Sequence, residues 1–255
     1  MTSKECDIFL ENVLEIGKRL VETGAEVHRV EDTVRRICIA YGFSNCEIYA
    51  VTSLIVATIK DNEGNHYTQS VRILSSGTDL GRMEELNASS RYICEHIPSV
   101  EELTTIVHSY KHTRPKPIIK CLGYMLAAGG FAVFFGGNWL DGIASAAVAI
   151  AIYFMDYHFK LRNINTVIYT FVASVASGCL ALIFVHFGFG IHSDKVMIGD
   201  IMLFIPGLLL VSSVKEMFNR DIVTGLYRFI EAVLVAVAIA CGFALSYVIL
   251  GGVLI

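Results

Sequence analysis

Three residues near the N-terminus have side chains and a spacing that could do chemistry. His28, Glu31 and Asp32 stand at positions i, i+3 and i+4, so they share one face of a helix. An imidazole beside two carboxylates could bind a cation or relay a proton. Acidic residues in the first turn of a helix also complement the helix dipole, which would leave His28 as a surface or interface residue. The sequence leaves both interpretations open.

A metal centre around these three residues would need further ligands, and none is spaced to supply them. The pattern also differs from the HExxH pair of zinc proteases, so it does not indicate a hydrolase. Seven cysteines are scattered along the chain without a CxxC pair, which indicates neither a zinc site nor a disulfide framework. We therefore expect no metal, no cofactor and no enzymatic activity.

The second half of the chain has its densest pattern in GDIMLFIPG, which begins at Gly199 and ends at Gly207. Pro206 lacks a backbone donor and Gly207 weakens the next turn, so a helix here should be kinked or unwound near its middle. Backbone groups freed inside a membrane need protein, water or ligand as partners, and interrupted helices line the substrate path of many transporters. The alternative is a purely structural kink packed against a neighbouring helix.

Charged residues accompany this pattern. Asp200 and Glu231 lie toward the ends of two predicted spans, where either could carry or relay a proton. Alternatively, Asp200 lies in the outer headgroup region and Glu231 pairs with Arg228, three residues earlier in the chain. The candidate residues for a substrate path or for coupling are Asp200, Pro206, Gly207, Asp221, Arg228 and Glu231.

The elements that must position these residues follow from hydropathy. The chain has 255 residues, of which 54% are hydrophobic and 17% charged, and most of the apolar excess lies in the second half. Crossing about 30 Å of hydrocarbon takes roughly 20 residues of helix. Five segments fit, at about 118–137, 139–157, 164–187, 196–214 and 225–252. The second is the least secure, because Asp141 and Asp156 lie near its two ends.

Loop charge predicts the orientation of these spans. A basic segment precedes the first span, and the loops with Lys160 and Arg162 and with Lys215 and Arg220 alternate with loops that hold few cations. The positive-inside rule then places the N-terminus in the cytoplasm and the C-terminus outside. The first 20 residues are too charged for a signal peptide, so the first span should direct insertion into the plasma membrane.

The first half of the chain has the composition of a charged globular domain. Helical periodicity from residue 9 to 21 and from 27 to 41 predicts two helices. Three strands should follow at 46–50, 53–60 and 65–73, and the last two are separated by a turn signal, Asp-Asn-Glu-Gly. Two more helices are expected at 79–95 and 100–112, which gives the order ααβββαα.

The predicted fold class is therefore an α+β cytoplasmic domain followed by an all-α transmembrane bundle of five helices. The domain should cover residues 1–112, a basic, proline-containing hinge 113–120, and the transmembrane part 121–255. The lipid bilayer is one expected partner. Nucleic acid is not among the expected partners.

The segment GAEVHRVEDT from Gly24, followed by this domain, the spans and the block from Ile205-Pro206-Gly207 to Glu231, resembles the threonine/serine exporter family over nearly the whole chain. The resemblance implies export of a small polar metabolite. It is closest to the N-terminal type of module, which in split members works with a separate small membrane subunit. Split members are associated with succinate export, and fused members with threonine and serine export.

We therefore expect a subunit of a secondary active exporter of amino acids or dicarboxylates, working with a companion membrane subunit in a homo- or hetero-oligomer. Nothing resembles a GxxxxGK[ST] loop, so ATP hydrolysis is not expected to drive export. Two alternatives are a membrane-anchored enzyme with its site around His28 and Glu31, and a regulatory or scaffold subunit that does not transport.

Overall fold

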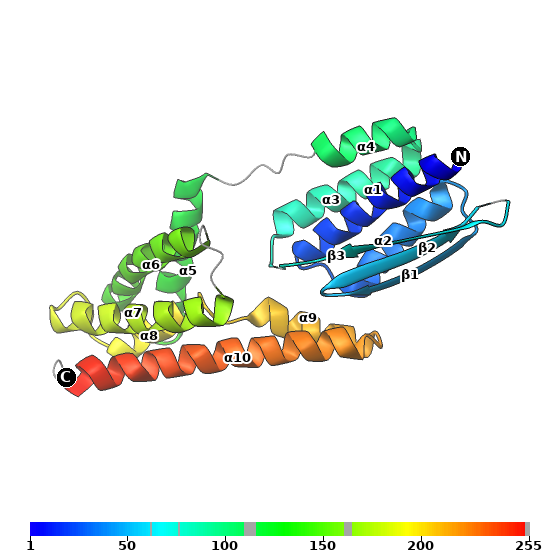
Figure 1. Cartoon of the computed structure of the whole chain (residues 1–255). Helices are drawn as coiled ribbons and strands as arrows, with labels where there is room; N and C mark the ends of the chain where they lie inside the picture. Colours follow the sequence, from blue (N-terminus) through cyan, green and yellow to red (C-terminus); the bar gives the residue numbers. More distant parts are fainter. Residues whose placement is uncertain (62, 76, 110–115, 161–164, 253–255) are drawn as a thin grey trace. The chain divides into compact units, whose positions relative to one another are not determined.

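The computed structural model describes residues 1–61, 63–75, 77–109, 116–160 and 165–252 (Figure 1). The chain divides into two units. The N-terminal unit contains Met1–Thr113 and Ser212–Tyr227, and the helical unit contains Arg114–Val211 and Arg228–Ile255. Residues 113–115 of the predicted hinge, and Arg162 of the predicted basic loop, lie outside the described residues, and the end of that hinge, from Pro117, is the start of a helix.

The N-terminal unit begins with seven elements in the predicted order. They are α1 (Ser3–Glu22), α2 (Val27–Ala40), β1 (Asn45–Val51), β2 (Leu54–Lys60), β3 (His66–Arg72), α3 (Leu80–His96) and α4 (Val100–Ser109). Thr2 and Glu5 form a capping box at the start of α1. Gly24, after the end of α1, has a φ of +89°, which only glycine adopts without strain.

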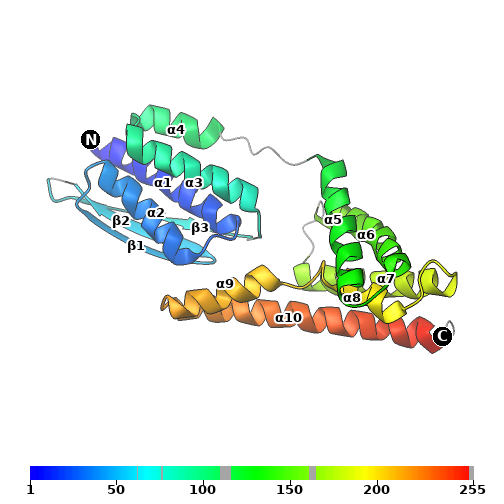
Figure 2. The same ribbon diagram turned by 180° about the vertical axis from the view of Figure 1, so that it is seen from behind.

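The three strands form one antiparallel sheet in the order β1-β2-β3. Its register pairs Ile48 with Ala57 and Ala57 with Gln69. Side chains alternate between faces, so Ile55, Ala57 and Ile59 of β2 are all buried on one side. Helices α1 and α2 cover that face, and α3 and α4 pack on the far side of these two helices (Figures 1 and 2).

The helical unit is built from α5 to α8, the start of α9 and most of α10. Their bounds are α5 (Pro117–Phe134), α6 (Trp139–Lys160), α7 (Thr166–His186), α8 (Ser193–Ile201), α9 (Gly207–Phe218) and α10 (Ile222–Ser246), which continues as a short π-helix, Tyr247–Gly251. The end of α9 and the first six residues of α10, Ile222 to Tyr227, belong to the N-terminal unit.

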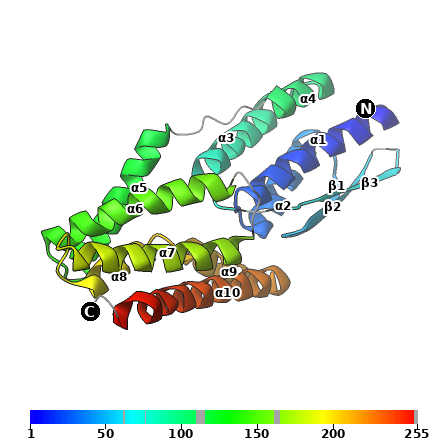
Figure 3. The same cartoon turned by 60° about the vertical axis from the view of Figure 1, so that its left-hand side comes forward.

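Small residues set the packing of the helical unit. A Cβ on Gly129 of α5 would lie 2.7 Å from the carbonyl oxygen of Gly142 in α6, so these two helices touch backbone to backbone. Between α7 and α10, Gly242 lies against Ser174 and Gly178 lies against Ser246. The residue numbers of the contacting positions increase in the same direction along the two helices, so α7 and α10 run parallel, side by side (Figure 3).

The predicted fold class is wrong. Among the described residues, four helices are long and apolar enough to cross a membrane: Pro117–Phe134, Trp139–Phe159, Thr166–His186 and Ile222–Gly251. The predicted fourth span, 196–214, is instead divided between α8 and α9, which have only 9 and 12 residues. The N-terminal unit is mostly helical with one small sheet, and it also takes in Ser212–Tyr227 from the predicted transmembrane part.

Candidate functional site

The chain is interrupted between α8 and α9, as the sequence predicted at Pro206. Helix α8 ends at Ile201, and the chain turns before α9 begins at Gly207. The amide of Leu203 donates to the carbonyl of Asp200 at 3.1 Å, and that of Gly207 donates to Ile205 at 2.8 Å. Turn hydrogen bonds therefore replace part of the helical ladder between the two helices, although the amide of Ile205 still donates to the carbonyl of Ile201 at 3.2 Å.

Asp200 lies in the last turn of α8 and is fully buried, with 0% of its surface exposed. Its Oδ1 accepts a hydrogen bond from the hydroxyl of Ser145 in α6 at 2.8 Å. Among the described residues, its Oδ2 has no hydrogen-bond partner. The hydroxyl of Ser177 in α7 faces the same carboxylate, but it does not meet the geometry of a hydrogen bond. Asp200 thus keeps one buried oxygen available.

The neighbouring Gly199 brings this carboxylate into the centre of the unit. A Cβ on Gly199 would lie 2.6 Å from the carbonyl oxygen of Ala128 and 2.6 Å from the hydroxyl of Ser145. Ala128 stands six residues before the end of α5, or about 9 Å along the helix at 1.5 Å per residue. Asp200 therefore lies inside the packed helices.

Two other acidic residues of the helical unit are fully engaged. Asp141 accepts hydrogen bonds from the amides of Ile191 at 2.7 Å, His192 at 2.9 Å and Asn138 at 3.0 Å. Its Oδ2 also lies 2.9 Å from Nδ1 of His192. These contacts fasten the start of α6 to the loop before α8. Asp141 therefore has a structural role.

Asp156, toward the end of α6, is tied to α5. Its Oδ2 accepts hydrogen bonds from Tyr124 at 3.0 Å and from Lys120 at 3.3 Å. Tyr124 also packs edge to face on Tyr153 of α6. Asp141 and Asp156 thus hold the two ends of α6 to neighbouring segments. Asp200 differs from both, because one of its carboxylate oxygens has no hydrogen-bond partner among the described residues.

The remaining predicted residues of the membrane half are dispersed. Pro206 is half-buried, and Gly207 is exposed with no atom within 4 Å of an added Cβ. On α10, Arg228 is buried and Glu231 is half-buried, within electrostatic range of Arg228. Asp221 belongs to the N-terminal unit, immediately before α10.

The N-terminal motif does not form one cluster, because its three residues contact different partners. Asp32 pairs with Arg36 at 2.9 Å on the surface of α2. Glu31 accepts a hydrogen bond from the amide of Ala50 in β1 at 2.8 Å. Nδ1 of His28 lies 3.1 Å from the side-chain nitrogen of Asn219. Among the described residues, no group of three or more potential ligands is placed to hold a metal ion.

The start of α2 is held by residues of α9 that are distant in the sequence. The ammonium of Lys215 lies 2.6 Å from Oε1 of Glu26. Glu216 is fully buried, and its Oε1 accepts a hydrogen bond from the amide of Val27 at 3.1 Å. Together with the contact of Asn219 to His28, these bonds form what we call the α2–α9 clasp, a set of contacts within the N-terminal unit.

The clasp also brings two predicted residues into electrostatic range, Glu31 and Asp221. Burial is the main cause that raises the pKa of Glu31, and the nearby charge of Asp221 raises it further. The hydrogen bond from Ala50 and the charges of Arg35 and His28 act in the opposite direction without cancelling the effect. Glu31 is therefore held in a site that disfavours its charged form.

Comparison with known proteins supplies the family. The sequence model of the threonine/serine exporter family matches residues 11–250, nearly the whole chain. The chain belongs to the threonine/serine exporter family. It is a multi-pass membrane protein, in keeping with its long apolar helices. No solved structure matches the chain.

Individual relatives of this exporter-family chain differ in length. The chain is 24% identical to the "Probable threonine/serine exporter" of Mycobacterium tuberculosis, and the match covers 94% of this chain and 46% of that relative. It is 22% identical to the "Threonine/serine exporter" of Corynebacterium glutamicum, and the match covers 91% of this chain and 49% of that relative. The chain thus spans about half the length of these two. It is 24% identical to the "Probable succinate transporter subunit YjjP" of Klebsiella aerogenes, covering 91% of this chain and 90% of the relative.

Several residues of this exporter-family chain that contact the predicted ones carried no signal in the sequence. Ser145 and Ser177 stand among many small residues of the spans, where close packing is the usual role. Glu216 and Asn219 match no motif, and their partners lie 189 and 191 positions away. Burial is the property that distinguishes Glu216, and the sequence alone does not show that this charged side chain is buried.

Proposed function

We propose that this chain is a subunit of a secondary active exporter of small polar metabolites, either amino acids such as threonine and serine or dicarboxylates such as succinate. The observation that carries the proposal is the carboxylate of Asp200, buried with one oxygen unpartnered at the end of an interrupted helix. The family membership and the printed names of the relatives support the class of activity.

The physical argument rests on the cost of burial. An isolated ionised carboxylate inside an apolar core is costly, so a buried carboxyl group must be matched by a proton, a cation or a hydrogen-bond donor. Ser145 supplies one donor to Asp200, and the second oxygen is left for a mobile partner. A proton that binds and leaves, or a polar group of the substrate, would fill that position during each transport cycle.

The interruption next to Asp200 supplies the conformational freedom that this cycle needs. Helix α8 can shift relative to α9 because the regular helical hydrogen-bond ladder is broken between Met202 and Pro206, where turn bonds of Leu203 and Phe204 replace part of it. Pro206 and Gly207 are assigned to this joint. Arg228 and Glu231 are assigned to the substrate path or to coupling through their buried and half-buried positions in α10, and Asp221 through its place before that helix.

A companion membrane subunit is part of the proposal. The chain covers 90% of the relative that is named a transporter subunit. The two relatives that are named exporters are about twice as long as this chain. A second hydrophobic module, on the same or another chain, would complete the path. Hydrolytic chemistry is not proposed, since the family is named for export.

The proposal places the protein in the plasma membrane with its N-terminus in the cytoplasm and its C-terminus outside. Helices α5, α6 and α7 alternate in direction, as shown by the contacts of Tyr124 with Asp156 and of Phe159 with Tyr169. Because α7 and α10 are parallel, the segment of α8 and α9 must return the chain to the side where α7 begins. That return supports opposite locations for the two termini.

The test is efflux of labelled succinate, threonine and serine from cells that lack endogenous exporters. Cells would express this chain with and without its candidate companion, as wild type, Asp200→Asn or Asp194→Asn. Asp194 lies exposed on the same helix as Asp200 and serves as the matched control. We expect export of one substrate class with both subunits, its loss in Asp200→Asn, and no change in Asp194→Asn. Full export by Asp200→Asn would refute the assignment of Asp200.

A further inference from the structure

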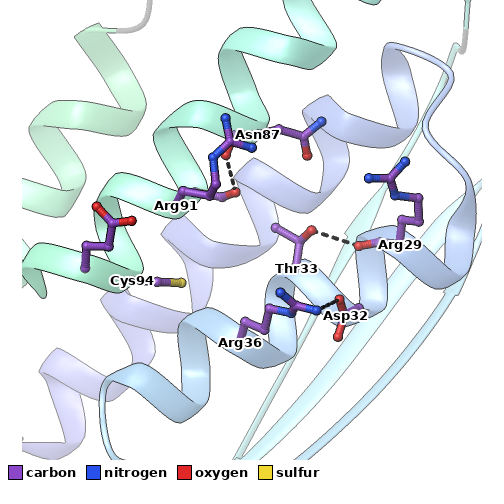
Figure 4. Close-up of a pocket in the computed structure, with 9 residues that line it drawn as sticks. Arg29, Asp32, Thr33, Arg36, Asn87, Arg91 and Cys94 are labelled. Atoms are coloured by element: carbon purple, nitrogen blue, oxygen red, sulfur yellow. Dashed lines mark hydrogen bonds and ion pairs between the residues drawn. The ribbon is translucent and has the colours of Figure 1, made fainter.

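A pocket of about 320 Å³ lies between α2 and α3 in the N-terminal unit (Figure 4). It is separate from Asp200, which belongs to the helical unit. Its lining is rich in arginine and in small polar side chains. The residues are Arg29, Asp32, Thr33 and Arg36 of α2, and Asn87, Ser90, Arg91, Cys94 and Glu95 of α3.

The three arginines of this pocket differ in their partners. Arg36 is neutralised by Asp32, with 2.9 Å between Nη2 and Oδ2. Among the described residues, the guanidinium groups of Arg29 and Arg91 have no ion-pair partner. They project from different helices around the same pocket (Figure 4). With Arg36 paired to Asp32, the pocket holds two further cations and one further carboxylate, Glu95, so its lining keeps a net positive charge.

The two hydroxyl groups of the lining do not compete with the arginines as donors. The hydroxyl of Thr33 already donates to the carbonyl of Arg29 at 2.8 Å, and that of Ser90 donates to Asn87 at 2.9 Å. The two free guanidinium groups are thus the strong donors of the pocket. A planar guanidinium offers two parallel N–H groups that match a carboxylate or a phosphate.

We propose that this pocket binds a small oxyanion, a phosphate or a carboxylate, held between Arg29 of α2 and Arg91 of α3. The carboxylate of Glu95, which also lines the pocket, limits the total negative charge that the pocket tolerates, which favours a small anion over a polyanion such as a nucleoside triphosphate. Phosphate and carboxylate share the recognition chemistry, and the experiment distinguishes them. The site is independent of the proposed transport path.

The test is calorimetric titration of the full-length chain in detergent, at low salt, with inorganic phosphate and with succinate as probes. We expect at least one of them to bind at a single site. Because hydrogen bonds to charged groups are strong, Arg29→Ala and Arg91→Ala should each weaken that binding by about tenfold or more. Arg91→Lys, which keeps the charge but loses the paired donors, should give an intermediate affinity.

Arg72→Ala is the matched control, because Arg72 is exposed on β3 and does not line the pocket. It should bind like the wild type. Because Arg29 and Arg91 are exposed, their variants should fold like the wild type, and the melting temperature verifies this. If neither probe binds, or if binding is unchanged in both Arg29→Ala and Arg91→Ala, the proposal is overturned. The probe that binds more tightly identifies the anion class.

Discussion

Glu216 of α9 accepts a hydrogen bond from the backbone amide of Val27, the first residue of α2, at 3.1 Å. The residue at the N-cap of α2, Glu26, makes no side-chain capping bond of its own. The first amides of a helix have no partner within the helix, and a carboxylate there also favours the helix dipole. Glu216 therefore caps α2 from a distant part of the chain.

Replacing Glu216 by Ala should destabilise the N-terminal unit. Loss of a helix cap costs about 0.5–2 kcal/mol, and Glu216 is fully buried, so the amide of Val27 would lose its partner without gaining water freely. We expect a lower free energy of unfolding in urea and faster hydrogen exchange in the first turn of α2.

Lys215→Ala provides the comparison. Lys215 also contacts the start of α2, through Glu26, but its side chain is 56% exposed, and an exposed ion pair contributes only about 0–1 kcal/mol. Its effect should therefore be smaller than that of Glu216→Ala. Equal effects of the two variants would mean that charge on α9, rather than the capping bond, holds the clasp together.

Glu31 should make stability depend on pH. Burial raises its pKa above the ordinary value of 4.5 in the folded protein, so the folded state binds this proton more tightly than the unfolded state. The free energy of unfolding should then fall as pH rises from below 4.5 through the raised pKa. Above the raised pKa, the stability that the bound proton contributes is fully lost.

The measurement compares wild type with Glu31→Gln in urea unfolding across this pH window. The carbonyl oxygen of Gln can still accept the hydrogen bond from Ala50, so the variant removes the titration but keeps the contact. The wild-type curve should decline relative to that of Glu31→Gln as pH rises. Parallel curves would show that Glu31 titrates alike in the folded and unfolded states.

Two glycines near the interruption should respond differently to substitution. A side chain on Gly199 would collide with the carbonyl of Ala128, whereas Gly207 has open space around it. Overpacking costs about 1–3 kcal/mol, so Gly199→Leu should lower the melting temperature in detergent. Gly207→Leu should melt like the wild type and, under the proposed mechanism, still lose export. Normal export by Gly207→Leu would remove Gly207 from the proposed joint.

Local patterns predicted the elements whose causes are local. Phe9, Val13 and Leu20 recur at helical spacing and are all buried in α1. The Asp-Asn-Glu-Gly segment marked the turn between β2 and β3, where Asp61 accepts hydrogen bonds from the amides of Glu63 and Asn65. Pro206 marked the interruption for the same reason, since a missing donor acts within one turn.

Hydropathy could not determine the length of each membrane helix. Segment 196–214 contains one acidic residue, Asp200, so its average is apolar enough for a span, but averaging hides a break in the middle. The contacts that define the candidate sites were also out of reach. Ser145 meets Asp200 across 55 positions and Lys215 meets Glu26 across 189, and no pattern in one sequence encodes such pairs.

The direction of α10 gives the last prediction, the location of the C-terminus. Gly242 and Gly178 place α10 parallel to α7, so both helices should cross from the cytoplasm outward although the described residues contain four long apolar helices. Fluorescent-protein and alkaline-phosphatase fusions measure this, because the first is active only inside and the second only outside. We expect fluorescence from an N-terminal fusion and phosphatase activity from a C-terminal one.

A fusion inserted after Asn219, in the turn between α9 and α10, is the internal control for the return of the chain. It should fluoresce, because the clasp holds this turn to the N-terminal unit through His28. A fluorescent C-terminal fusion together with a fluorescent fusion after Asn219 would mean that α10 does not cross. Phosphatase activity after Asn219 would instead mean that α8 and α9 do not return the chain, and the parallel arrangement of α7 and α10 would then be untenable in the membrane.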